Sequence, residues 1–337
     1  MITTSSPGKI ILFGEHAVVY DRLGIACAID KRCKVKAFPC SGKAVFIKSK
    51  NLNLTKSLEE KELFGLYENI NSLIKEKNFD KIKEIYKNNE LIPSFFVLAS
   101  IFKKHGFKGL EIEIDSEVPE NLGSSSAVFS AIAFGVLKFL NKDISKKEVS
   151  DFAYYGDVIA HGGTPSGIDN NTVTFGGYVK YRQSEGVGLL AIDFQIPLLI
   201  IDSGEKVKTG ELVAYVRSQK EKNPDFVNSV LNNLNSISER ALKVLNSKEF
   251  DGLGLLMTEY YEELKKLNIS TPRLDKIVEI ALKNKALGVK PTGAWGGGCC
   301  LALMENQEDI FKLKEIFTQN GFKSFQAKIG AEGVKCI

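Results

Sequence analysis

The sequence of 337 residues contains one tryptophan, three histidines and six cysteines, and no two cysteines form a C-x-x-C pair. Without such a pair or any zinc-finger spacing, the chain is not expected to hold structural zinc. The first residues lack the charged and apolar segments of a signal peptide, so the thiols are expected to stay reduced in the cytoplasm. The six cysteines are Cys27, Cys33, Cys40, Cys299, Cys300 and Cys336.

Long apolar runs are also missing, and no stretch reaches the length needed to span a membrane. The formal net charge is only +4, and the lysines are dispersed along the chain instead of forming a basic stripe. These two absences argue against a membrane partner and against nucleic acid as a partner.

Three common nucleotide-binding signatures are absent as well. There is no G-x-x-x-x-G-K-[ST] loop, because Gly42 and Lys43 lack the upstream glycine, and this excludes a P-loop NTPase. There is no H-R-D or D-F-G motif, which excludes a protein kinase. Gly186 and Gly188 lack both the third glycine and the preceding buried strand of a dinucleotide-binding fingerprint.

The length of the chain and the order of its patterned segments predict two domains. The first half is rich in strand patterns, with a charged stretch of helical spacing from about residue 54 to 104 that includes Leu58 and Leu63. In the second half a buried strand at residues 196–202 precedes four predicted helices, and strand, helix and strand close the chain. We therefore expect an α+β fold with domains at residues 1–187 and 188–337. The four helices are expected at about residues 209–221, 225–246, 249–267 and 273–286.

Residues 119–128 (PENLGSSSAV) lie between two well-patterned segments. Residues 110–115 alternate apolar and acidic side chains, which predicts a half-buried strand, and residues 127–137 are apolar enough for a buried helix. The glycine and three serines therefore mark the start of a helix, where backbone N–H groups lack partners and the helix dipole favours an anion. The serines could also simply cap the helix. This stretch alone leaves both readings open.

Three other loops and one predicted helix carry polar side chains that a core would not need. Glu15 and His16 interrupt two apolar runs, although a lone histidine is more often structural. Asp157 and His161 are four residues apart on one helix face, a spacing that usually gives a surface hydrogen bond. Asp169 follows the turn-forming residues 162–168, where it could equally form an Asx-turn. Residues 290–300 form the last glycine-rich loop.

In order and spacing, these loops resemble the motifs of the GHMP family of small-molecule kinases. The similarity rests on residues 7–20 (PGKIILFGEHAVVY), 122–127 (LGSSSA), 161–177 (HGGTPSGIDNNTVTFGG) and 292–299 (TGAWGGGC), and it extends to residues 329–334. Within the family, the sequence EHAVVY is similar to that of the mevalonate kinases and differs from that of the galactokinases. The resemblance implies an N-terminal domain like ribosomal protein S5 domain 2 and a ferredoxin-like C-terminal domain, with the site between them.

The resemblance also implies a reaction and a set of roles. The reaction would be ATP- and Mg²⁺-dependent phosphorylation of the 5-hydroxyl of mevalonate. Asp169 would be the catalytic carboxylate, assisted by Lys9, and Ser125 and Asp157 would bind Mg²⁺ through oxygen. The residues matching the family's phosphate loop are Leu122, Gly123, Ser124, Ser125 and Ser126. Those matching its acceptor contacts are Glu15, His16, Thr209 and Thr292.

The chain departs from the family pattern in its phosphate loop, which is two residues shorter and lacks two glycines, and at Trp295, where a glycine is usual. Two alternatives to a mevalonate kinase stay open. One is a GHMP kinase for another acceptor, such as phosphomevalonate or a sugar. The other is a nucleotide-dependent sensor without catalysis, which would be expected to have lost Lys9, Ser125 or Asp169. A homodimer also stays open.

Overall fold

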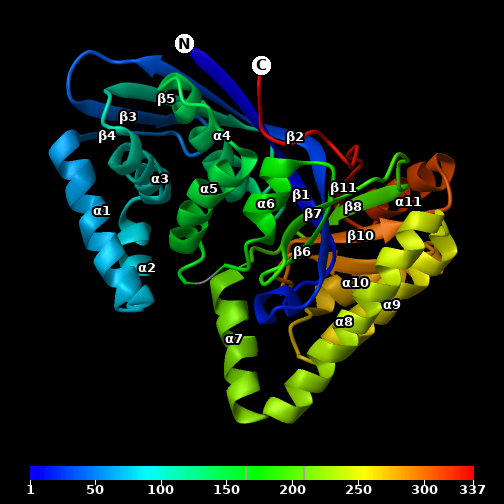
Figure 1. The fold of residues 1–337 in the computed structure, drawn as a ribbon. Helices are drawn as coiled ribbons and strands as arrows, with labels where there is room; N and C mark the ends of the chain where they lie inside the picture. The colour runs from blue at the N-terminus through cyan, green and yellow to red at the C-terminus, as the bar shows by residue number, and fades with distance from the viewer. Residues whose placement is uncertain (164, 208) are drawn as a thin grey trace.

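The computed structural model describes residues 1–163, 165–207 and 209–337. It consists of two units, each built on its own β-sheet with helices packed against it (Figure 1). Within the described residues no helix is both long and apolar enough to cross a lipid bilayer.

The first sheet has eight strands, with the path β12-β1-β2-β5-β3-β4, and β6 and β7 branch from β2. The long strands β1 and β2 pair antiparallel along most of their length, with irregular register after Pro7 and after Ile11. In β5 the leucine and isoleucines are buried and all three acidic residues are at least partly exposed, which confirms the half-buried strand predicted there. The strands are β1 (Ile2–Phe13), β2 (Gly24–Pro39), β3 (Ala44–Ser49), β4 (Leu54–Glu59), β5 (Leu110–Ser116), β6 (Tyr178–Arg182), β7 (Gly186–Leu190) and β12 (Lys335–Cys336).

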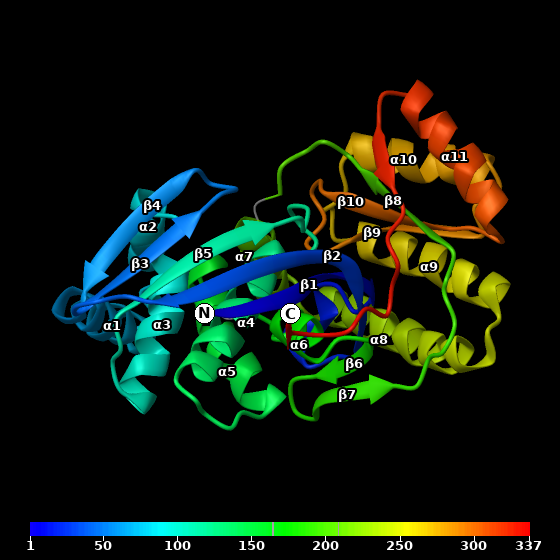
Figure 2. The ribbon, with the colours of Figure 1, turned by 90° about the horizontal axis from the view of Figure 1, so that it is seen from above.

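The helices of the first unit lie on one face of this sheet (Figures 1 and 2). The helix after the Gly-Ser stretch, α4, packs against β1 and β2, and it is apolar on most sides because α3 and α5 cover its flanks. Ser145 caps α5 by accepting a hydrogen bond from the backbone N–H of Glu148. The helices are α1 (Glu60–Lys75), α2 (Phe79–Asn88), α3 (Ile92–His105), α4 (Ser124–Phe139), α5 (Lys146–Ala160) and α6 (Ile168–Phe175). A short 3₁₀ helix, η1 (Ala17–Tyr20), follows β1.

The second unit has a four-stranded antiparallel sheet with the order β11-β8-β10-β9. Four helices separate β8 from β9, as the sequence predicted, and α7 and the start of α8 project away from both sheets (Figure 1). The strands are β8 (Leu198–Asp202), β9 (Gly288–Thr292), β10 (Cys299–Leu303) and β11 (Lys323–Phe325). The helices are α7 (Thr209–Lys222), α8 (Pro224–Ser247), α9 (Phe250–Lys265), α10 (Pro272–Lys283) and α11 (Gln307–Gln319).

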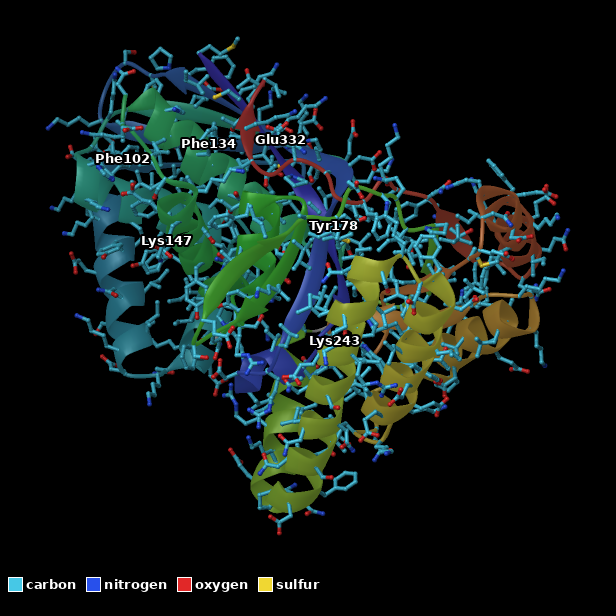
Figure 3. All side chains as sticks on the ribbon, turned by 45° about the vertical axis from the view of Figure 1, so that its right-hand side comes forward. Phe102, Phe134, Lys147, Tyr178, Lys243 and Glu332 are labelled. Carbon is cyan, nitrogen blue, oxygen red and sulfur yellow. The ribbon has the colours of Figure 1, made fainter. Side chains whose placement is uncertain are left out.

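The two units are joined more intimately than a single linker would join them. The expected boundary after residue 187 falls inside β7, whose hairpin with β6 belongs to the first sheet. After β11 the chain returns to the first unit, where Glu332 bridges to Gly176 and β12 pairs with β1 (Figure 3, in which Glu332 and Tyr178 are labelled). Both chain ends therefore lie side by side on the first sheet.

Candidate active site

An ion pair between Lys9 and Asp169 lies at the centre of the first unit. Lys9 comes from β1 and Asp169 from the first turn of α6, and the Lys9 Nζ atom is 2.8 Å from Asp169 Oδ1. The lysine side chain is only 3% exposed, whereas the aspartate is 27% exposed. The helix dipole of α6 favours a negative charge in its first turn. The pair therefore presents a carboxylate that is oriented by a buried lysine and is partly accessible.

The Gly-Ser stretch packs directly on this lysine. The backbone N–H of Lys9 donates to the carbonyl oxygen of Leu122 at 2.8 Å. Gly123 is the N-cap of α4 with φ +77°, and a Cβ atom there would lie 2.7 Å from Cγ of Lys9. The serines therefore occupy the first turn of the helix and not its N-cap position, so their N–H groups have no partners within the helix. This geometry supports the anion-site reading of the stretch over the capping reading.

The third serine of the stretch is bound to Asp157. The Ser126 hydroxyl lies 2.7 and 2.9 Å from the two carboxylate oxygens of Asp157, and both side chains are buried. Burial raises the pKa of Asp157 well above its usual value, and the negative charge of Asp169 raises it further. His161 lies on the same helix face with Nε2 3.8 Å from an Asp157 oxygen, and burial lowers its pKa. Ser125, which the sequence paired with Asp157, is exposed.

The second unit reaches Glu15 through a buried ion pair. Lys290 of β9 binds the Oε1 atom of Glu15, and both side chains are fully buried. Burial raises the pKa of Glu15, and the adjacent Lys290 charge opposes that shift. Burial likewise lowers the pKa of Lys290. The hydroxyl of Tyr260 accepts from the N–H of Gly14 and donates to the carbonyl oxygen of Glu15, both at 3.0 Å. Glu15 is thus fixed through both its side chain and its backbone.

His16 and Thr292 also join the two units. His16 has a positive φ (58°), and its Nε2 lies 2.8 Å from the carbonyl oxygen of Ala294. Burial lowers the pKa of His16, so a neutral ring with its proton on Nε2 makes this bond. The Thr292 hydroxyl accepts from the N–H of Ile11 at 2.9 Å and donates to its carbonyl at 3.0 Å. The Thr292 hydroxyl therefore both donates a hydrogen bond to β1 and accepts one from it.

Comparison with known proteins identifies the architecture. Family models described as "GHMP kinases N terminal domain" and "GHMP kinases C terminal" match residues 93–177 and 241–323. A mevalonate kinase of Pyrococcus furiosus is 33% identical over 91% of this chain and 90% of its own. One of Thermococcus sibiricus is 31% identical over 99% and 98%. The chain belongs to the mevalonate kinases of the GHMP kinase family.

The likeness extends to the three-dimensional structure. The crystal structure of the Methanococcus jannaschii mevalonate kinase superposes on this GHMP kinase with a TM-score of 0.78, covering 97% of this chain and 98% of the other at 26% identity. The α+β GHMP kinase fold expected from the motifs is therefore confirmed. As a member of this family, the enzyme uses ATP as its co-substrate.

Thr209 and Trp295 occupy less central places in this kinase. Thr209 begins α7 and is partly exposed, and a Cβ atom on the neighbouring Gly210 would lie 2.7 Å from the carbonyl oxygen of His161. The start of α7 therefore packs against the end of α5. The Trp295 side chain is fully buried and stacks on Tyr261, with ring centroids 5.7 Å apart. Trp295 is thus part of the hydrophobic core and is not accessible to a ligand.

Sequence reasoning did not single out Lys290 or Tyr260. The signal for Lys290 was a charged residue in an otherwise apolar strand, residues 288–292, where a solvated face would alternate more regularly. Tyr260 had no comparable signal, because a tyrosine at helical spacing usually belongs to the core. Within the described residues no group of three or more histidine, cysteine and acidic side chains is arranged to hold a metal ion.

Proposed function

We propose that the chain transfers the γ-phosphoryl group of ATP to the 5-hydroxyl of mevalonate. The observation that carries this proposal is the position of Lys9. Its stem packs beneath Gly123 at the start of α4, and its ammonium group binds Asp169. A helix N-terminus suited to phosphate and a carboxylate suited to a hydroxyl proton therefore share one buried cation.

The arrangement supports a direct transfer. Asp169 accepts the proton of the acceptor hydroxyl as that oxygen forms a bond to the γ-phosphorus. The bond between the γ-phosphorus and the β,γ-bridging oxygen breaks, and ADP leaves with the electron pair. Lys9 orients the Asp169 carboxylate and stabilises charge on the transferred group. Phosphoryl transfer depends mainly on such positioning and electrostatic stabilisation.

We propose that Asp157 and Ser125 hold the Mg²⁺ that accompanies ATP. The residues suit this ion because Asp157 is a buried carboxylate whose ionisation is opposed by burial and by Asp169, and a cation would relieve both effects. Carboxylate and hydroxyl oxygens are the ligands that Mg²⁺ accepts in proteins. When bound, the ion would neutralise phosphate charge. Ser126 would keep the Asp157 carboxylate oriented.

A hollow lies beside the same helix turn. Ser124 and Ser125 form part of its wall, and the remainder is largely apolar, with Leu52, Tyr86, Pro93 and Val128 among its residues. An apolar wall with a few polar groups suits a purine ring. We propose that the base lies in this hollow and the phosphates at the serines.

The acceptor would lie on the other side of Asp169, toward the second unit. Glu15 and His16 each retain a side-chain atom beyond the contacts described above, namely Oε2 and Nδ1. We propose that these two residues contact mevalonate and that Thr209 borders the site from α7. Because both polar functions of the Thr292 hydroxyl bind Ile11, Thr292 would act by holding β9 against β1.

A coupled ADP-release assay with Mg·ATP tests the proposal. The enzyme is offered mevalonate, phosphomevalonate and galactose in parallel, and turnover is expected with mevalonate. ADP release with another acceptor and none with mevalonate would refute the substrate assignment. No ADP release with any of the three would favour a sensor.

A further inference from the structure

Three contacts from the second unit converge on Gly14, Glu15 and His16 of the first. Lys290 binds the Glu15 carboxylate, Tyr260 bonds the backbone of Gly14 and Glu15, and the Ala294 carbonyl accepts from His16. The acceptor side of the site is therefore shaped by a unit that contributes neither the catalytic carboxylate nor the phosphate-binding helix.

Lys290 is fully engaged where it lies. Besides Glu15, its Nζ atom donates to the carbonyl oxygens of Pro291 at 2.9 Å and Ile11 at 3.4 Å, and it lies 5.4 Å from the centre of the Tyr260 ring. A fully buried ion pair is a poor way to gain stability, because desolvation of both charges offsets most of their attraction. A role in orienting Glu15 accounts for the pair better than stability does.

The Glu15 carboxylate is only half satisfied. Lys290 binds Oε1, whereas Oε2 is buried and has no hydrogen-bond partner among the described residues. A buried carboxylate oxygen without a donor is costly, so a donor from outside the protein is expected there. Mevalonate carries a carboxylate and hydroxyl groups. The carboxylate would be repelled by Glu15, so a hydroxyl is the group that can donate to Oε2.

We propose that Lys290 is a positioning residue for the acceptor, which holds the Glu15 carboxylate so that Oε2 receives a hydrogen bond from an acceptor hydroxyl. This inference rests on the proposed function of the site. Lys290 touches neither the reacting atoms nor ATP, so its loss should weaken acceptor binding and leave nucleotide binding unchanged. A trapped water at Oε2 would give a different result, since losing Lys290 would then change stability alone.

The test compares Lys290→Met, Glu15→Gln and the double variant in steady-state kinetics. Each single variant is expected to raise the KM for mevalonate about tenfold or more while the KM for Mg·ATP stays within about twofold. Because both changes remove one interaction, the double variant should be no worse than Glu15→Gln alone. Lys283→Met is the matched control, since Lys283 is an exposed lysine paired with Glu279 on α10. Its kinetics should equal those of the wild type.

The variant Asn235→Ala distinguishes a positioning role of Lys290 from a purely structural role in joining the two units. Asn235 joins the units elsewhere, by accepting from the N–H of Leu23 at 3.0 Å. This variant should lower the melting temperature without a selective rise in the mevalonate KM. The inference is overturned if folded Lys290→Met keeps a normal mevalonate KM, or if both KM values rise together.

The double variant keeps the test decisive if Lys290→Met alone does not fold, because removing both charges leaves no unpaired ion. A mevalonate KM clearly higher in the double variant than in Glu15→Gln would mean that Lys290 acts independently of Glu15, which also overturns the inference. Absence of mevalonate turnover by the wild type would instead refute the proposed function.

Discussion

The Ser126 hydroxyl donates a hydrogen bond to the Asp157 carboxylate, whose two oxygens lie 2.7 and 2.9 Å from Ser126 Oγ. The neighbouring Ser125 is exposed. The contact joins the first turn of α4 to the last turn of α5. Two adjacent serines of one helix turn therefore differ: one orients a buried carboxylate, and the other is exposed.

Ser126→Ala should lower the free energy of unfolding by about 1–3 kcal/mol, because it leaves a buried carboxylate without its hydroxyl donor. Ser125→Ala should change it by less than about 0.5 kcal/mol. Urea denaturation of both variants measures this difference. Under the Mg²⁺ assignment, Ser125→Ala should instead raise the Mg²⁺ concentration needed for half-maximal rate. Equal stability of the two variants would contradict the division of tasks.

Asp169→Asn should reduce kcat on the order of 10²–10⁴-fold, because the amide cannot accept the hydroxyl proton. Asp151→Asn is the matched control, since Asp151 is an exposed aspartate paired with Lys147 on the surface of α5. Single-turnover measurement of ADP formation distinguishes a slower chemical step from slower product release. Near-normal turnover by a folded Asp169→Asn enzyme would show that another group takes the proton.

Gly123→Ala should impair both folding and catalysis. The added Cβ would lie 2.7 Å from the Lys9 stem, and φ of +77° is strained for alanine. We expect a stability loss of about 1 kcal/mol or more and a kcat loss of about tenfold to hundredfold, because Lys9 would shift. In Gly65→Ala the new methyl group meets nothing within 4 Å inside α1, so that variant should gain up to about 1 kcal/mol. Thermal melting and kcat of the pair provide the check.

His16 should make the protein less stable in acid. Burial holds its pKa below the usual 6.5, so the unfolded chain binds a proton first as the pH falls. Stability is therefore lost from about pH 6.5 downward, until the pH reaches the lowered pKa of the folded state. His16→Asn removes this titration, and asparagine adopts a positive φ more readily than most residues do.

The measurement for His16 is the difference in unfolding free energy between wild type and variant from pH 7 to pH 5. As the pH falls, the unfolding free energy of the wild type should decrease relative to that of His16→Asn. Glu15 and Asp157, whose raised pKa values act in the opposite direction, are present in both proteins and largely cancel. A constant difference across this range would show that His16 titrates normally.

Local patterns predicted three elements of the first unit that lie around the catalytic pair. The alternation in β5, the cap at Ser145 and the apolar run of α4 are all short-range signals, and each is present in the structure. One short-range prediction was wrong. Leu58 seemed to continue the helical spacing of the following segment, but it lies in β4 because the β3–β4 hairpin offers it a backbone partner.

Contacts between the units could not be found in this way. Glu15 and Lys290 are separated by 275 positions, and nothing in either segment alone indicates which charged residue it will meet. The sequence also could not show whether Ser125 or Ser126 binds Asp157, because this depends on how α4 is rotated against α5. Family motifs locate the segments of a site, whereas the hydrogen bonds among its side chains depend on packing.

The return of the chain end to the first sheet affects how the protein is made. β1, which carries Lys9, has β2 on one side and β12 on the other, and β12 consists of Lys335–Cys336. During synthesis the amino-terminal half emerges from the ribosome long before those last residues do. The catalytic strand therefore gains its second neighbour only after the whole second unit has been translated. Until then, Thr4 and Ser5, the residues of β1 that pair with β12, lack this strand partner, and an unpaired strand edge can pair with another chain.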